Sequence, residues 1–244
     1  MRNLLAAGLI LFGLSGFGYA ASTPEEAISD SLKQINSRIN AISIKPAEMQ
    51  GLYAIELDSG ELLYSDAKGE FFMIGALYQL SEKEGFVNLT EGKRKSQRQE
   101  MLAQIEDKDI IVFPAEGESK ATLTVFTDVS CGYCRKLHEE VPTLNKMGIQ
   151  VNYLAFPRQG VGSRPYQVME SIWCAVPEKR NEMMTAAKTG GSVEPARCES
   201  PVLAQLMLGQ SIGVTGTPAL VFEDGTLLPG YLPAKQLAKR MNLE

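Results

Sequence analysis

Positive charge and histidine are both scarce in this chain of 244 residues. Lysine and arginine number 24 against 29 acidic residues, so the formal net charge is −5. This balance offers no basis for a nucleic-acid partner, since phosphate backbones are bound by an excess of basic groups. The basic cluster Lys93-Arg94-Lys95 with Arg98 is flanked by glutamates, and we interpret it as a solvated helix face.

Long apolar runs are missing except at the N-terminus. Met1-Arg2-Asn3 carries one positive charge, Leu4 to Phe17 is apolar, and Gly18-Tyr19-Ala20 ends in a small residue. This pattern predicts a secretory signal peptide over residues 1–20, cleaved before Ala21. An uncleaved membrane anchor is the alternative, but the run is short of the ~20 residues that a bilayer span needs. We therefore expect a protein exported to the periplasm.

Cysteines are few, and the expected export places them in an oxidising compartment. The four are Cys131, Cys134, Cys174 and Cys198; none comes directly after the expected cleavage point, which argues against a lipid anchor. In an exported chain, cysteines form disulfides or carry out disulfide chemistry.

The first 70 residues after the leader predict a small α+β domain. Thr23-Pro24-Glu25-Glu26 combines a capping hydroxyl, an N-terminal proline and a glutamate three residues after the cap, which is typical of a helix start. Three short strands are predicted at 52–57, 61–65 and 70–74, separated by turn residues. Such a unit has little core and open sheet edges, so we expect oligomerisation to complete it.

The remaining sequence predicts a polar linker helix and then an α/β domain with a mixed sheet. We place the N-terminal domain at 21–88, the linker at 89–108 and the second domain at 109–244. The second domain alternates strand-like and helical segments and contains a long helical insert. Expected strands are 110–113, 123–126, 149–156, 219–222 and 226–228; expected helices follow Cys134 and cover about 164–190, 201–212 and 232–241.

Cys131-Gly132-Tyr133-Cys134 follows a predicted strand and opens a predicted helix. The N–H groups and partial positive charge of a helix N-terminus stabilise a thiolate, and the thiolate is the nucleophile in disulfide exchange. We expect Cys131 to be exposed and to attack a substrate disulfide. Cys134, one turn deeper on an apolar stripe, is expected to be shielded and to resolve the mixed disulfide.

Other roles for the four cysteines are compatible with the sequence. The motif could be half of a zinc site with His138, although Cys174 and Cys198 show no matching short spacing. A purely structural bridge between Cys131 and Cys134 is also possible. We interpret Cys174 and Cys198 as a structural pair closing a loop that contributes roughly 3 kcal/mol, with a second redox pair as the alternative. For His138 an ordinary helix-surface or half-buried position is expected.

Three segments carry a resemblance to a known family. Residues 126–138 (FTDVSCGYCRKLH), 153–160 (YLAFPRQG) and 216–219 (GTPA) resemble the DsbC/DsbG family of bacterial periplasmic disulfide isomerases. The likeness is dense in the second domain. It is weaker in the first, where 63–66 (LYSD) and 75–78 (GALY) are similar to the family's dimerisation domain.

The resemblance implies a thioredoxin fold with a helical insert, preceded by a cystatin-like dimerisation domain. Pro218 would be cis beside the motif, and Thr217, Pro218, Gly132 and Tyr133 would contact substrate. Cys174 and Cys198 would form the family's structural disulfide. The implied protein is a homodimer that acts on misfolded, disulfide-containing exported proteins without a cofactor or metal. A membrane-embedded thiol reductase resembling DsbD would keep it reduced.

Three alternative functions remain: a DsbG-like reductase and chaperone that protects single cysteines, a monomeric DsbA-like oxidase, and a holdase with purely structural disulfides. The DsbG branch tends to carry proline inside the motif, whereas this chain has Gly132-Tyr133. Thioredoxin places a buried acid six residues before the first cysteine, where this chain has Val125. The nearest acid is Asp128, which we expect to be structural.

Overall fold

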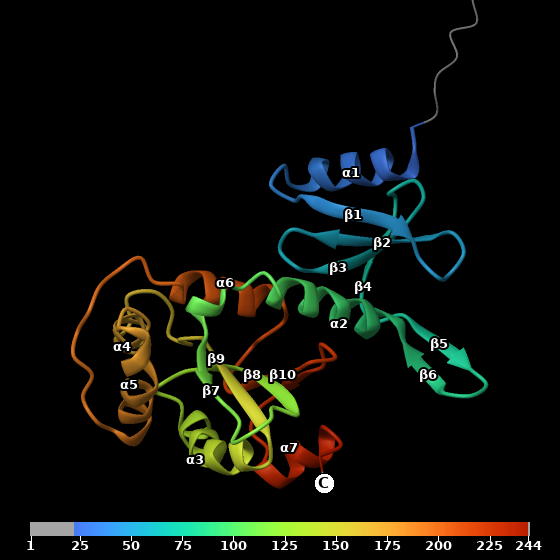
Figure 1. Cartoon of the computed structure of the whole chain (residues 1–244). Coiled ribbons are helices and arrows are strands. Elements are labelled where there is room, and N and C mark those ends of the chain that lie inside the picture. The colour runs from blue at the N-terminus through green and yellow to red at the C-terminus, as the bar shows by residue number, and fades with distance from the viewer. Residues whose placement is uncertain (1–21, 244) are drawn as a thin grey trace, which may run out of the picture. The chain divides into compact units, whose positions relative to one another are not determined.

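A computed structural model describes residues 22–243. The predicted signal peptide therefore lies outside the described residues. The chain divides into two compact units, Met1–Leu57 with Leu63–Met73 and Asp58–Leu62 with Ile74–Glu244, each of which is described separately (Figure 1). Within the described residues, no helix is long and apolar enough to cross a membrane.

The first unit packs one helix on an antiparallel sheet. Thr23 caps the helix as predicted: its hydroxyl accepts from the Glu26 N–H, and the Glu26 carboxylate accepts from the Thr23 N–H. The elements are α1 (Pro24–Ile35), β1 (Ala41–Pro46), β2 (Leu52–Leu57), β3 (Leu62–Asp66) and β4 (Phe72–Ile74), with the four strands in that order across the sheet. Ile28 and Leu32 of α1 contact Ile55 and Leu57 of β2, which forms the core.

A hairpin and a long helix open the second unit. β5 (Tyr78–Ser81) and β6 (Gly85–Asn88) pair only with each other, and α2 (Leu89–Leu102) follows directly. The Thr90 hydroxyl accepts from the Leu77 N–H, which ties the start of the hairpin to the helix.

The prediction that the basic residues of this helix form a solvated face is wrong for Arg98. Arg98 is buried, and its guanidinium donates to the carbonyls of Ile212 and Gly225 while pairing with Glu91 at 2.6 Å. Lys95 pairs with Asp224 at 2.9 Å. Apart from Glu91, these partners lie more than 100 residues away in sequence, so a local charge pattern could not indicate them.

The rest of the second unit is a five-stranded mixed sheet with helices on both faces. Strand order is β11-β10-β8-β9-β7, in which β8 and β9 are parallel and the other pairs antiparallel. The strands are β7 (Ile111–Phe113), β8 (Ala121–Thr127), β9 (Ile149–Ala155), β10 (Ala219–Phe222) and β11 (Leu227–Pro229). The helices are η1 (Asp107–Asp109), α3 (Gly132–Lys146), α4 (Arg164–Trp173), α5 (Pro177–Thr189), α6 (Val202–Ser211) and α7 (Ala234–Arg240).

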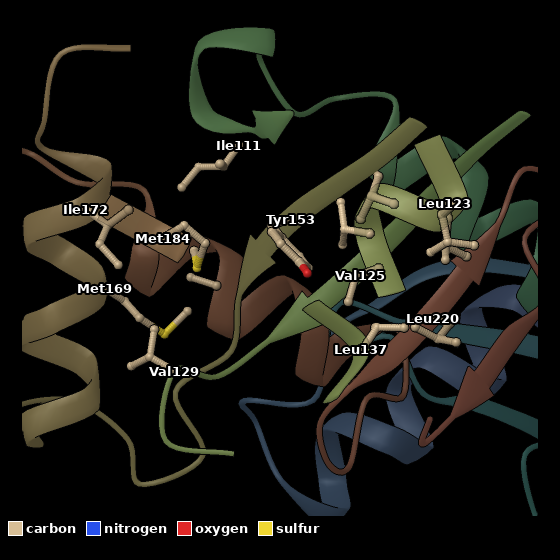
Figure 2. Close-up of a cluster of buried hydrophobic side chains, with 14 of the residues drawn as sticks. Ile111, Leu123, Val125, Val129, Leu137, Tyr153, Met169, Ile172, Met184 and Leu220 are labelled. Carbon is tan, nitrogen blue, oxygen red and sulfur yellow. The ribbon is translucent and has the colours of Figure 1, made fainter. Parts of the chain in front are cut away.

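Alternation along the strands divides the core into two layers. Leu123 and Val125 of β8 face the larger cluster, which includes residues of α3, α4, α5 and α7, whereas Phe126 faces α6. Figure 2 shows the larger cluster, with Tyr153 of β9 and Leu137 of α3 among its labelled members. On the other face α6 approaches closely, because a Cβ on Gly209 would lie 2.6 Å from the Phe156 ring. Both layers converge on the end of β8, where the cysteine motif begins.

Candidate active site

The cysteine motif lies where β8 gives way to α3. Cys131 is the N-cap of α3, Cys134 lies in its first turn, and both are free thiols. Cys134 is buried, as predicted, with 1% of its surface exposed. The prediction that Cys131 is exposed is wrong, since only 4% of its surface is accessible.

The loop before β10 covers Cys131. The Thr217–Pro218 peptide bond is cis, and the Cys131 thiol donates to the Thr217 carbonyl at 3.2 Å. Gly132 and Tyr133, by contrast, are exposed, and the Tyr133 ring stacks on Tyr231 with 6.4 Å between centroids. Of the four residues predicted to contact substrate, Thr217 thus contacts the sulfur of Cys131 and Pro218 follows it across the cis bond, while Gly132 and Tyr133 lie exposed next to Cys131 in sequence.

The environment of Cys131 favours its thiolate. Burial alone would raise the pKa of the thiol, but hydrogen bonds from the Thr217 side chain and the Cys134 backbone N–H, together with the charge of Arg158, hold it below the ordinary value. In the described part of the chain, the buried Thr217 hydroxyl has no hydrogen-bond partner that meets the distance and angle of a full bond. It is thus placed to donate once the thiol proton is gone and the carbonyl contact loses its donor.

Asp128 fixes the loop that leads into the motif. Its side chain is fully buried and accepts from the Ser130 N–H and hydroxyl, both at 2.7 Å, and from the Arg158 N–H and Nε at 3.1 and 2.9 Å. Burial raises the pKa of this carboxyl, but the bonds from Ser130 and Arg158 outweigh burial and lower it. Asp128 is therefore an anion that accepts two bonds from its own loop and two from Arg158 beyond β9, consistent with the structural role expected for it.

A cluster of polar side chains lies buried beneath Cys134. His138, one turn further along α3, contacts the Tyr153 hydroxyl through Nδ1 at 3.0 Å and the Thr185 hydroxyl through Nε2 at 3.1 Å. The prediction of a surface or half-buried histidine is wrong because α5 and β9 enclose this side of α3. Burial and the charge of Lys188 lower the pKa of His138 to about 4, so the ring is neutral at neutral pH. With both nitrogens engaged, His138 is not oriented toward a metal site with the cysteines.

Lys188 is a residue of the site that the sequence did not indicate. This lysine near the end of α5 is only 3% exposed, and its Nζ donates to the Thr127 hydroxyl at 2.6 Å and the Asp128 carbonyl at 3.0 Å. Burial lowers the pKa of Lys188 to about 8, against the attraction of Cys134. A lysine in a polar helix carries no sequence signal for burial, and only the packing of α5 on α3 reveals it.

The other two cysteines form a disulfide inside the helical insert. Cys174 and Cys198 are joined with 5.6 Å between their Cα atoms, at a sequence separation of 24. The loop that they close contains α5, and the Ser171 hydroxyl beside the bridge accepts from the Ala196 N–H. This geometry matches the structural pairing that the resemblance implies.

Comparisons with known proteins agree with this geometry. A profile described as "Disulfide bond isomerase protein N-terminal domain" matches residues 19–91, and one described as "Thioredoxin-like domain" matches residues 106–243. The thiol:disulfide interchange protein DsbC of Escherichia coli (strain K12) is 38% identical over 231 residues, covering 94% of this chain and 93% of that protein. The chain belongs to the DsbC family. The DsbC of Dickeya dadantii is 37% identical over 236 residues, covering 97% of this chain and 93% of its own.

A solved structure extends the comparison to the fold. The crystal structure of a disulfide interchange protein from Neisseria gonorrhoeae aligns with a TM-score of 0.50 at 26% identity, over 57% of this chain and 96% of that one. The DsbC family therefore accounts for both parts of the chain: an N-terminal domain with an antiparallel sheet, then a linker helix and a thioredoxin-like domain with a helical insert. The chain is a thiol:disulfide interchange protein with Cys131 and Cys134 as its paired thiols.

Proposed function

We propose that the protein is a homodimeric disulfide isomerase of the periplasm that rearranges wrong disulfides in exported proteins. The observation that carries the proposal is the setting of Cys131, an N-cap thiol of lowered pKa beneath the cis Thr217–Pro218 bond. The family's N-terminal domain supports the homodimer, and the apolar leader supports export.

The reaction uses thiols alone. The Cys131 thiolate attacks one sulfur of a substrate disulfide, forming a mixed disulfide while the other substrate sulfur leaves as a thiolate. That thiolate attacks a second disulfide of the substrate, and a substrate thiolate then displaces Cys131 unchanged. When the complex persists, Cys134 attacks the sulfur of Cys131 and releases reduced substrate. The resulting Cys131–Cys134 disulfide must be reduced again, which is the role we assign to a DsbD-like membrane reductase.

Substrate binding is assigned to the surface around the sulfur. Thr217 and Pro218 would pair with an extended substrate backbone, while Gly132 and Tyr133 leave the approach open. A groove of about 580 Å³ opens beside Ser130 and is lined by Val129, Arg135, Arg164, Val168 and Val193 among others. Its mixture of apolar and basic side chains suits an unfolded chain of broad sequence better than one particular ligand.

Refolding of a scrambled multi-disulfide protein tests the proposal. Catalytic amounts of the reduced chain in glutathione buffer should restore the native substrate, Cys131→Ser should abolish this activity, and Cys134→Ser should retain part of it. Activity that survives Cys131→Ser would indicate a holdase. Fast oxidation of a reduced substrate without repair of the scrambled one would indicate an oxidase. Sedimentation of the same sample measures the dimer directly.

A further inference from the structure

The burial of the Lys188 ammonium costs free energy of desolvation, and no ion pair among the residues that the structure describes compensates for it. An ammonium group taken out of water destabilises a fold unless an anion or several acceptors compensate for the lost hydration. Its two hydrogen-bond acceptors, the Thr127 hydroxyl and the Asp128 carbonyl, are both neutral. The face of the Tyr153 ring, 5.7 Å from Nζ, adds a weak attraction.

Of the charged or ionisable groups that face Lys188, one, the Cys134 thiol, is not already neutralised by another group and can be stabilised as an anion by the ammonium. The Asp128 carboxylate attracts Lys188 but is already bound by Ser130 and Arg158, and Arg135 repels it. His138 is neutral at the pH of interest. Among the attractive groups, Cys134 has the largest influence, ahead of Asp128 and Cys131.

The interaction is seen from the side of Cys134 as well. Burial raises the pKa of this thiol, and the charge of Lys188 is the foremost influence that lowers it. The geometry places both groups in the same buried region. Cys134 is 1% and Lys188 is 3% exposed, and the Lys188 Nζ donates to Thr127 and Asp128, where β8 ends just before the motif. A thiolate at Cys134 would there have little stabilisation from water.

We propose that Lys188 is a positioning residue for disulfide exchange, whose buried ammonium stabilises the Cys134 thiolate when Cys134 attacks the mixed disulfide. The step rests on the proposed role of Cys134 as the resolving thiol. Cys134 gives up its proton to solvent and its sulfur forms a bond with the sulfur of Cys131. The bond between Cys131 and substrate breaks, and the substrate sulfur leaves with the electron pair and takes a proton from water. Lys188 stays protonated throughout.

The pKa of Cys134 tests this role without any isomerase substrate. In a Cys131→Ser background the remaining free thiolate is followed by its ultraviolet absorbance. Lys188→Met should raise the pKa of Cys134 by about one unit, Lys188→Arg should restore most of the shift, and Lys179→Met on the exposed face of α5 should change nothing. An unchanged pKa in a folded Lys188→Met protein would overturn the proposal.

The kinetic consequence is measured with the intact motif. The reduced chain reacts with an aromatic disulfide, and the second thionitrobenzoate released reports the attack of Cys134. Raising the pKa by one unit lowers the fraction of Cys134 present as thiolate about tenfold. Each remaining thiolate is more nucleophilic, so Lys188→Met should slow this phase about threefold. The first phase, from Cys131, should change less. Equal slowing of both phases would point to a general structural defect and would count against the proposal.

Reciprocity provides a test that leaves Lys188 in place, in case its variants fold poorly. Because coupling between two titrating groups is mutual, Cys134 must also raise the pKa of Lys188. Nuclear magnetic resonance of the lysine side chain should show Lys188 losing its proton at higher pH in Cys131→Ser than in Cys131→Ser with Cys134→Ala. Identical titrations would refute the coupling, whereas failure of the refolding assay alone would refute only the proposed isomerase function.

Discussion

Replacing Lys188 by methionine should make the thioredoxin-like domain more stable at pH 7. The pKa of Lys188 falls from 10.5 to about 8 on folding, so holding the ammonium in the folded state costs about 3 kcal/mol at neutral pH. Methionine has a similar length and no charge. It leaves the Thr127 hydroxyl and the Asp128 carbonyl without their donor, which costs about 1–2 kcal/mol. The expected net gain is about 1–2 kcal/mol in the free energy of unfolding.

The pH dependence separates this effect from ordinary repacking. Below pH 8 both folded and unfolded chains carry the Lys188 proton, so the difference between wild type and variant is constant. From about pH 8 to 10.5 the unfolded chain binds more protons than the folded one, so this lysine makes wild type more stable as pH rises. The advantage of the variant should therefore shrink through this window and be lost by its upper end.

Trp173 makes the assay specific to one domain. It is the only tryptophan of the chain, is 1% exposed, and donates from its indole to the Asp109 carbonyl. Its fluorescence in urea therefore reports unfolding of the thioredoxin-like domain, and oxidising the Cys131–Cys134 pair removes thiol titration. A variant less stable than wild type at pH 7, or a difference that stays constant to pH 10.5, would show that the ammonium is not held at a penalty.

Three further variants are expected to destabilise the same domain, each measured by the urea midpoint. Asp128→Asn should cost about 2 kcal/mol at pH 7 because it weakens the bonds with Arg158 and the loop. The deficit should vanish in acid, where the wild-type carboxyl, whose pKa is lowered, takes up its proton. A deficit independent of pH would contradict this reasoning. Cys174→Ala with Cys198→Ala should cost about 3 kcal/mol, and equal midpoints with and without reductant would show that the bridge contributes nothing. Arg98→Met should cost about 2–3 kcal/mol by leaving two buried carbonyls unpaired, whereas Arg98→Lys should recover part of the loss; a neutral Arg98→Met would mean that water replaces the guanidinium.

The central strands were predictable from sequence, whereas β1, β5 and β6 were missed. The apolar runs at 123–126 and 149–156 correspond to β8 and β9, because central strands need apolar residues on both sides. β1 alternates with Ser43 and Lys45 and ends at Pro46, so it carries no such run. The β5–β6 hairpin has large exposed side chains such as Leu80 and Phe86, and no buried face imposes a period on it.

In the site, the covalent chemistry was predictable but the surroundings were not. The spacing and position of Cys131 and Cys134 predict a pair of thiols at a helix N-terminus, and the structure has them there. The shielding of Cys131 depends on a loop 86 residues away, and the burial of Lys188 depends on how α5 packs. Long-range contacts of this kind leave no periodic trace in one sequence.

The setting of the Cys131–Cys134 pair depends on whether the Cys174–Cys198 bridge has formed. The bridge closes the segment that contains α5, and α5 carries Lys188 and Thr185 of the buried polar cluster beneath Cys134. While this pair is still reduced, α5 is freer, because the closed loop limits the conformations available to the segment. Under the role proposed for Lys188, oxidation of Cys174 and Cys198 thus sets the electrostatic environment of Cys134. A chain of the proposed function would then need one disulfide of its own before it exchanges others at its full rate.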